Sequence, residues 1–287
     1  MLVLDGLTVG LIILLVIGAY LIGAMYIYAP FKIRRQQAKD VKVDYVPIEL
    51  PELAPEVAQA FFDATRGLAA CGFRAIGHLT HCTHKTAQES YVSIWVNPSG
   101  VEHAQVIGVC TPSELQGLRV VTLVTFRTEF TDGSSIVTTS SSSTGVFPRD
   151  PKISAIRCPG IRDFALLYRF HRARVERDRA GRTATLDRVK DARTRMENEW
   201  TETYHRLIGA GYYSLDLTRQ QYVPTLKGAF LMTYRLLPPF KQIQRFQRDR
   251  AAERTLRELG FGGMDAFRNA QSLPAAVGAA STVASPR

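Results

Sequence analysis

The chain has 287 residues, of which 46% are hydrophobic and 22% are charged, so we expect a folded core. Four cysteines in a chain of this length exclude a dense disulfide framework of the kind that stabilises small secreted domains. The formal net charge of +10 predicts a negatively charged partner, either nucleic acid or the inner leaflet of a membrane.

The N-terminal segment 6–31 contains no charged side chain. As a helix, its apolar centre is long enough to cross a hydrocarbon layer of about 30 Å. A secretory signal peptide is the alternative, but such a peptide begins with basic residues, and residues 1–5 contain none. We therefore predict a transmembrane helix over residues 6–29.

Charges on either side of this helix predict its orientation. Four cations follow it, Lys32, Arg34, Arg35 and Lys39, whereas the acid Asp5 precedes it. Basic flanks stay in the cytoplasm, so we expect a single-pass protein of the inner (plasma) membrane with its N-terminus outside. A cytosolic domain beside the bilayer favours anionic lipids over nucleic acid as the partner of the positive charge. Ala19 and Gly23, four residues apart, predict a homodimer through this helix.

Residues 30–51 are predicted to form a juxtamembrane linker, since charges of both signs and three prolines interrupt any periodicity. Residues 52–145 are predicted to form a helix plus an antiparallel sheet. The helix is expected over 55–71, because its apolar residues recur at helical spacing. These residues are Val57, Phe61, Ala64 and Leu68.

Alternating apolar and polar residues then predict strands over 73–83, 90–97, 101–110, 118–130 and 134–139. Asp132-Gly133 is a strong signal for a tight turn between the last two strands. The strands should form an antiparallel meander that the preceding helix covers on one face.

The remainder is predicted to be mainly helical. After a loop over 140–160, residues 161–260 should form a helical region that packs on or beside the sheet, with a break at Gly209-Ala210-Gly211. Residues 261–287 are expected to be a disordered tail, since they end in a run of small and polar residues. The predicted fold class is α+β: one N-terminal transmembrane helix, a helix with an antiparallel β-meander, and a helical C-terminal region.

One cluster of metal-ligand residue types occurs, His81, Cys82 and His84, with His78 just before it. A straight strand would hold His78 and His84 about 20 Å apart, too far for one ion. A turn at 80–83 would gather His81, Cys82 and His84 around zinc. The alternative is a set of polar residues on a strand and its loop.

The segment 225–257 is apolar at first and basic afterwards, which predicts a second contact with the membrane surface. The residues expected to make this contact are Phe230, Leu231, Tyr234, Arg235, Lys241 and Arg245. The alternative is a buried helix followed by a solvated one.

Two segments resemble a set of uncharacterised bacterial single-pass membrane proteins: Phe126-Arg127-Thr128-Glu129-Phe130-Thr131-Asp132-Gly133 and Thr225-Leu226-Lys227-Gly228-Ala229-Phe230. The resemblance covers most of the chain, implies a bacterial membrane protein and supplies no activity.

The sequence contains no nucleophile elbow, phosphate loop or dinucleotide fingerprint. We therefore expect no catalytic residues and no cofactor, and a membrane-anchored cytosolic module that binds or scaffolds an unknown protein partner. The alternative is a metal-binding sensor or metal-dependent enzyme that uses His81, Cys82 and His84.

Overall fold

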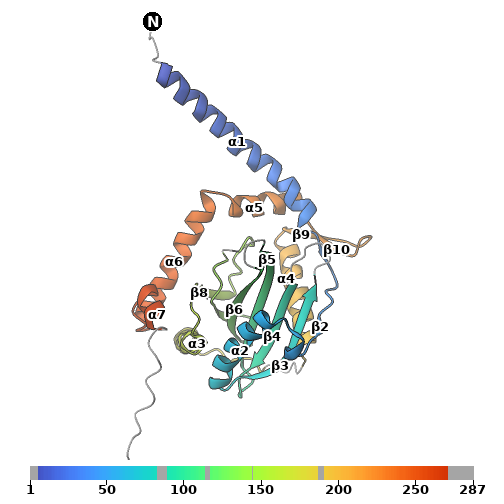
Figure 1. The fold of residues 1–287 in the computed structure, drawn as a ribbon, viewed down its shortest axis with the longest axis vertical. Helices are drawn as coiled ribbons and strands as arrows, with labels where there is room; N and C mark the ends of the chain where they lie inside the picture. The colour runs from blue at the N-terminus through green and yellow to red at the C-terminus, as the bar shows by residue number, and fades with distance from the viewer. Residues whose placement is uncertain (1–5, 83–88, 114–116, 144, 187–190, 271–287) are drawn as a thin grey trace, which may run out of the picture. The chain divides into compact units, whose positions relative to one another are not determined.

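The computed structural model describes residues 6–82, 89–113, 117–143, 145–186 and 191–270 (Figure 1). The chain divides into two units. The anchor unit comprises Met1–Val46, Ser143–Asp150 and Asp191–Gln247, and the sheet unit comprises Pro47–Ser142, Pro151–Lys190 and Arg248–Arg287. Strand β2 (Val46–Pro47) and helix α6 (Phe240–Glu258) cross the boundary, so each contributes to both units.

The anchor unit combines a long apolar helix with a small sheet and two packed helices. Its sheet has the antiparallel order β1-β10-β9. The elements are α1 (Gly6–Gln36), β1 (Lys39–Asp40), α4 (Ala192–Gly209), β9 (Tyr213–Asp216), β10 (Gln221–Pro224), α5 (Leu226–Leu236) and the first half of α6.

Aromatic side chains form the core of the anchor unit. Tyr204 of α4 stacks on Tyr222 of β10 with ring centroids 4.4 Å apart, and Tyr213 packs edge-on against the same ring of Tyr204. Ile33, in the last turns of α1, packs against this cluster. The apolar helix is therefore packed directly onto its folded unit.

Two expectations for this part of the chain are wrong. Residues 30–36 belong to α1, because Pro30 is buried inside the helix and Ile33 packs into the core, so the predicted linker 30–51 begins too early. The predicted helical region 161–260 contains the hairpin β9–β10. Its turn forms because the Asp216 carboxylate accepts hydrogen bonds from the backbone N–H groups of Thr218 and Arg219.

The sheet unit is built on seven strands in the order β2-β3-β4-β5-β6-β7-β8. The last pair, β7 and β8, is parallel, and the described pairs from β3 to β7 are antiparallel. The strands are β3 (Arg74–Cys82), β4 (Glu89–Val96), β5 (Glu102–Ser113), β6 (Gly117–Glu129), β7 (Ser135–Thr139) and β8 (Ile153–Arg157).

The predicted meander is confirmed over β3 to β7. Gly133 has a φ of +75° in the turn between β6 and β7, and the Asp132 carboxylate accepts the Ser134 N–H at 2.9 Å. Strand β8 falls inside the segment predicted as a loop over 140–160. A parallel partner for β7 is not signalled by local alternation, because β8 is short and its residues are mostly half-buried.

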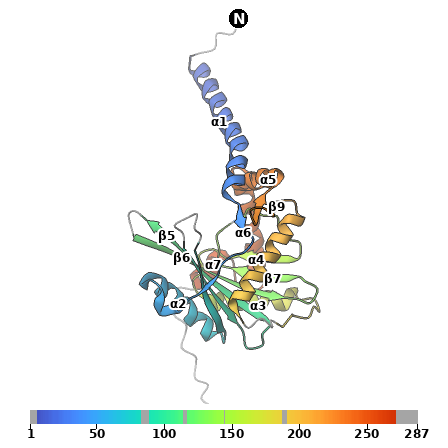
Figure 2. The same cartoon turned by 90° about the vertical axis from the view of Figure 1, so that its right-hand side faces the viewer.

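Helices α2 (Pro55–Ala70) and α3 (Phe164–Asp178) contact β6 and also each other (Figures 1 and 2). The stripe predicted for α2 is confirmed, since all four of its apolar residues are buried. Phe61 lies so close to Gly108 of β5 that a Cβ at this glycine would approach the ring to 2.4 Å. Side-chain packing therefore fixes α2 against the sheet.

The sheet unit contains two further short helices, one near its start and one near its end. A short 3-10 helix, η1 (Leu50–Glu52), precedes α2, and α7 (Met264–Ala270) follows α6. Helix α7 lies within the predicted disordered tail 261–287, and its Phe267 is buried against Phe170 of α3. Residues 271–287 lie outside the described part of the chain.

Candidate membrane-contact surface

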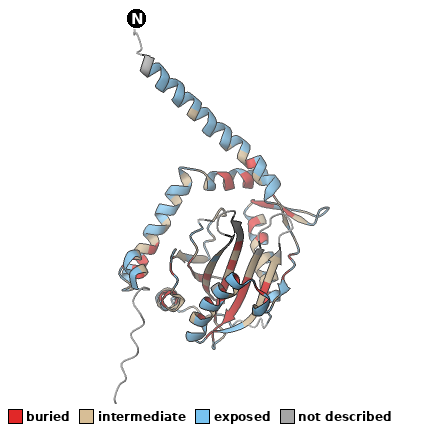
Figure 3. Cartoon of the chain, viewed as in Figure 1, coloured by how far each residue is buried: buried red, intermediate tan, exposed pale blue. Residues whose placement is uncertain are grey.

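Helix α1 exposes an apolar surface along most of its length (Figure 3). Of the described residues, its segment Thr8–Gln36 alone forms a helix long and apolar enough to cross a membrane. Side chains such as Leu14 and Tyr20 are more than 70% exposed. So large an exposed apolar surface is unfavourable in water, and hydrocarbon is the solvent that suits it.

Helix α5 packs closely against its own unit on one face. Thr225 caps its N-terminus by accepting the Gly228 N–H at 2.9 Å. A Cβ at Gly228 would lie 2.1 Å from the Tyr212 carbonyl oxygen, so only glycine permits this approach. Ala229, Met232 and Thr233 complete the buried face.

The same helix contacts the end of α1. The ring of Phe230 packs edge-on against that of Phe31, with centroids 6.5 Å apart. The hydroxyl of Tyr26 donates a hydrogen bond to the carbonyl oxygen of Pro238, directly after α5. Figure 1 shows α5 beside the end of α1. Both contacts involve the part of α1 where aromatic residues gather, as they do at membrane–water interfaces.

The opposite face of α5 and the start of α6 expose large apolar side chains. Phe230 is 42% exposed in spite of its contact with Phe31, and Phe246 is 59% exposed. The exposed apolar residues of these two elements are Leu226, Phe230, Tyr234, Leu236, Ile243 and Phe246. We call this set the apolar strip.

Cations accompany the apolar strip without any acid in the same stretches of sequence. Residues 6–39 contain no Asp or Glu, and neither do residues 217–248. On the helices of these two stretches, the exposed cations are Lys32, Arg34 and Arg35 on α1, Lys227 on α5, and Lys241 and Arg245 on α6. Since the whole chain has 26 acids, two acid-free stretches of this length make these segments distinctly basic.

The structure distributes the six predicted surface residues between two environments. Phe230, Tyr234, Lys241 and Arg245 are exposed. Leu231 is half-buried and packs against the tyrosine core. Arg235 is also half-buried, and its guanidinium donates to the Phe147 carbonyl and lies 6.0 Å from the centre of the Tyr212 ring. Leu226, Leu236, Ile243 and Phe246 were not among the predicted residues. Of these, Leu226 had a sequence signal, because it lies four residues before Phe230, whereas Ile243 and Phe246 belong to the separate helix α6.

The predicted metal cluster falls partly outside the described residues. His84 is not described, and neither is the side chain of Cys82. His78 and His81 lie on β3, where residues three apart point to opposite faces of the sheet. Among the described residues, no group of three His, Cys, Asp or Glu is arranged to hold a metal. Zinc binding therefore stays a prediction, as does dimerisation through Ala19 and Gly23.

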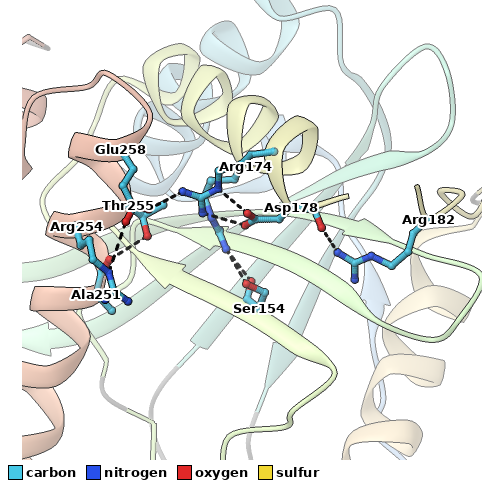
Figure 4. Close-up of polar contacts among 9 residues, drawn as sticks. Ser154, Arg174, Asp178, Arg182, Ala251, Arg254, Thr255 and Glu258 are labelled. Carbon is cyan, nitrogen blue, oxygen red and sulfur yellow. Dashed lines mark hydrogen bonds and ion pairs between the residues drawn. The ribbon is translucent and has the colours of Figure 1, made fainter. Parts of the chain in front are cut away.

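The sheet unit buries a polar cluster that the sequence did not indicate. Arg174 of α3 is fully buried and donates to the Val137 carbonyl and the Thr138 hydroxyl. It also donates to the Ser154 carbonyl (Figure 4). It thereby joins α3 to β7 and β8. The only sequence signal for its burial was its helical spacing with the apolar residues of α3, such as Leu167 and Phe170.

His171 lies beside Arg174 and is equally buried. Its Nδ1 is 2.9 Å from the Thr138 hydroxyl and its Nε2 is 3.0 Å from the Thr128 hydroxyl. Burial, together with the Arg174 charge, lowers the pKa of His171 to about 3. Since the Thr138 hydroxyl accepts from Arg174 and can donate to Nδ1, a neutral imidazole with its proton on Nε2 satisfies the cluster. We interpret these residues as structural.

A second buried contact joins α3 to the start of β5. Glu102 accepts hydrogen bonds from the Tyr168 hydroxyl at 2.5 Å and from the Asn97 amide at 3.0 Å. Burial, followed by the hydrogen bond to Glu102, raises the pKa of Tyr168. The Glu102 carboxylate and the Tyr168 phenol thus have hydrogen-bond partners within the protein.

Comparisons with known proteins give no match: no protein-family model fits the chain, and neither the curated proteins nor the solved structures include a significant relative. The candidate membrane-contact surface therefore rests on its own geometry and chemistry.

Proposed function

We propose that the protein is a single-pass membrane-anchored module that binds or scaffolds a protein partner at the cytosolic face of the inner membrane. In this proposal α1 crosses the bilayer and α5 lies at the interface beside it. One observation carries the proposal: α5 packs on the end of α1 and still exposes an apolar strip.

The orientation follows from charge. Lys32, Arg34 and Arg35 are exposed directly after the apolar part of α1, and basic residues are retained on the cytoplasmic side. Each cation close to an anionic leaflet contributes about 1 kcal/mol to its attraction. The lipid bilayer, with its anionic lipids, is therefore the first partner of the protein.

The role of the folded part is binding rather than catalysis. The sequence supplies no catalytic motif, and the buried groups His171, Arg174 and Glu102 and the half-buried Tyr168 of the sheet unit are used in packing hydrogen bonds. A broad sheet with helices on it offers surface for a protein partner, and the anchor holds that surface near the membrane.

A topology experiment on the full chain tests the proposal. One epitope tag is placed before Met1 and another after Arg287, and spheroplasts are treated with external protease. We expect loss of the N-terminal tag only, and retention of the protein in membranes at alkaline pH. A protected N-terminal tag, or release of the protein by alkaline carbonate, would show that the proposed anchor or its direction is wrong.

A further inference from the structure

We infer that the corner between α5 and α6, residues 236–240, enters the bilayer beside α1, and that the cations around it bind anionic phospholipid headgroups. This inference rests on the proposed function, since it uses α1 as the membrane span. It adds to that proposal the part of the chain that inserts and the lipid class that it contacts.

The contacts with α1 give the depth of the corner. As a helix, residues 7–26 span about 30 Å, so Tyr26 lies where the hydrocarbon ends on the cytosolic side. Phe31 is five residues further along, which places it about 7.5 Å nearer the cytosol. Phe230 contacts Phe31, whereas Pro238 contacts Tyr26. Helix α5 therefore descends toward the hydrocarbon from Phe230 to Pro238.

The backbone of the corner suits an apolar environment. A bilayer offers no water to hydrogen-bond, so each backbone N–H and carbonyl in it needs a partner within the protein. The Leu237 N–H donates to the Thr233 carbonyl at 3.0 Å, and its carbonyl accepts the Lys241 N–H at 3.1 Å. The next two residues, Pro238 and Pro239, have no N–H at all.

The carbonyl groups of the two prolines are also satisfied. That of Pro238 accepts the hydroxyl of Tyr26, and that of Pro239 accepts the Ile243 N–H at 3.1 Å. From Leu237 to Pro239 every backbone donor and acceptor is therefore accounted for at a turn between two helices, where unpaired groups are the rule.

Side chains around the corner divide into an apolar centre and basic flanks. Leu236 is 39% exposed, and Tyr234 stacks on Phe240 with ring centroids 3.5 Å apart. Lys227 lies at the start of α5, and Lys241 and Arg245 lie after the corner on α6. With no acid from residue 217 to 248, a neutral or cationic surface would not complement this region, whereas an anionic leaflet does.

Depth is tested with the full chain in nanodiscs that contain lipids brominated at shallow or deep acyl positions. The variants Leu236→Trp and Phe246→Trp report on the corner and α6. Leu217→Trp is the matched control, because Leu217 is an exposed leucine of the same unit on the β9–β10 hairpin. The signal of the unmodified protein, from Trp95 and Trp200, is subtracted.

We expect bromine quenching of Leu236→Trp to exceed that of Leu217→Trp severalfold, with Phe246→Trp between them. Equal quenching of Leu236→Trp and Leu217→Trp would overturn the inference. A probe within α1, Tyr20→Trp, separates the two proposals. If deep bromines do not quench it, the membrane span itself fails; if they quench it and Leu236→Trp is unaffected, only the corner fails.

Lipid preference is tested with spin-labelled phosphatidylglycerol and phosphatidylcholine added to the same nanodiscs. We expect a severalfold excess of motionally restricted phosphatidylglycerol. The triple variant K227Q/K241Q/R245Q should bring the two lipids close to parity. The control K42Q/R149Q/R219Q removes three other exposed cations of the anchor unit and should keep the preference. Parity in the unmodified protein, or an equal loss in the control, would overturn the lipid assignment.

Discussion

Helices α3 and α5 each bury one face in their own unit, but their outer faces carry opposite chemistry. On α3 the outer face carries charges of both signs, and the Arg177 guanidinium contacts Asp178 at 2.6 Å and Glu258 at 2.8 Å. On α5 the outer face carries large apolar residues and one exposed cation, Lys227, and the helix contains no acid. Figure 4 shows how α3, β8 and the second half of α6 are held together by polar contacts.

The difference is the one expected if α3 faces water and α5 lies at the proposed lipid interface. A helix that faces water exposes charged side chains of both signs, which are hydrated and partly paired. A helix at a lipid interface exposes aromatic and aliphatic side chains beside cations. On the inner faces the polar helix is α3, which buries His171 and Arg174. Helix α5 buries small and apolar residues there.

The strongest test of this comparison removes the buried cation of α3. Arg174→Leu leaves the Val137 and Ser154 carbonyls without their donor, and we expect the sheet unit to lose about 3 kcal/mol or more of unfolding free energy. Arg172→Leu, an exposed position of the same helix, is the control and should change stability by less than about 0.5 kcal/mol. Similar urea midpoints for the two variants would contradict a structural role for Arg174.

His171 predicts a dependence of stability on pH. Its pKa is about 3 in the folded protein and about 6.5 when unfolded, so the unfolded state binds the extra proton between these values. The stabilisation is complete above pH 6.5 and is lost as the pH falls toward 3, by a few kcal/mol in total. Thermal melts from pH 8 to pH 4 should show a weaker pH dependence for His171→Gln than for the exposed control His205→Gln.

Charged substitutions on the outer face of α5 should destabilise α5 itself and leave the sheet unit unchanged. Phe230→Glu with Tyr234→Glu places charge in the proposed interface, where each lost aromatic contact costs about 1 kcal/mol. In nanodiscs we expect faster amide hydrogen exchange in α5 and no change in the melting of the sheet unit. Unchanged exchange in α5 would mean that this face meets water in the native protein, as that of α3 does.

The smallest expected effect comes from one hydroxyl. Tyr26→Phe removes the donor to the Pro238 carbonyl, which costs about 1 kcal/mol or somewhat more where water cannot replace it. Exchange at Lys241 and the following amides of α6 should rise, while Tyr28→Phe, on a 70% exposed side chain of α1, should leave it unchanged. Identical exchange in both variants would show that the corner does not depend on Tyr26.

Local patterns predicted the elements whose signal lies within a few residues. The stripe of α2 and the alternation of β6 were confirmed, because a helix or strand that packs on one face repeats its apolar residues at a fixed period. Asp132-Gly133 marked its turn, since turn chemistry is also local. Strand β8 was missed because its pairing partner β7 lies across a loop and the pair is parallel. The β9–β10 hairpin is local, but its strands have only four residues each, too few to show a clear alternation, and β10 is completed by β1 from far away in the sequence.

Local patterns also did not decide which residues of the candidate surface are exposed. Phe230, Tyr234, Lys241 and Arg245 were predicted from composition and are exposed, but Leu231 and Arg235 have the same residue character and turn inward. A helix of 11 residues with apolar side chains on several faces leaves its orientation open. The close approach of Gly228 to Tyr212 selects which face of α5 is buried.

The sequence alone therefore determined the apolar span, its basic flank and the acid-free character of residues 217–248, because these are properties of consecutive residues. Only the tertiary structure decided that α5 packs on the end of α1, that Tyr26 reaches Pro238, and that Arg174 and His171 are buried together. Those contacts join distant parts of the chain. They depend on packing and hydrogen-bond geometry in the folded protein, which the periodicity of consecutive residues does not specify.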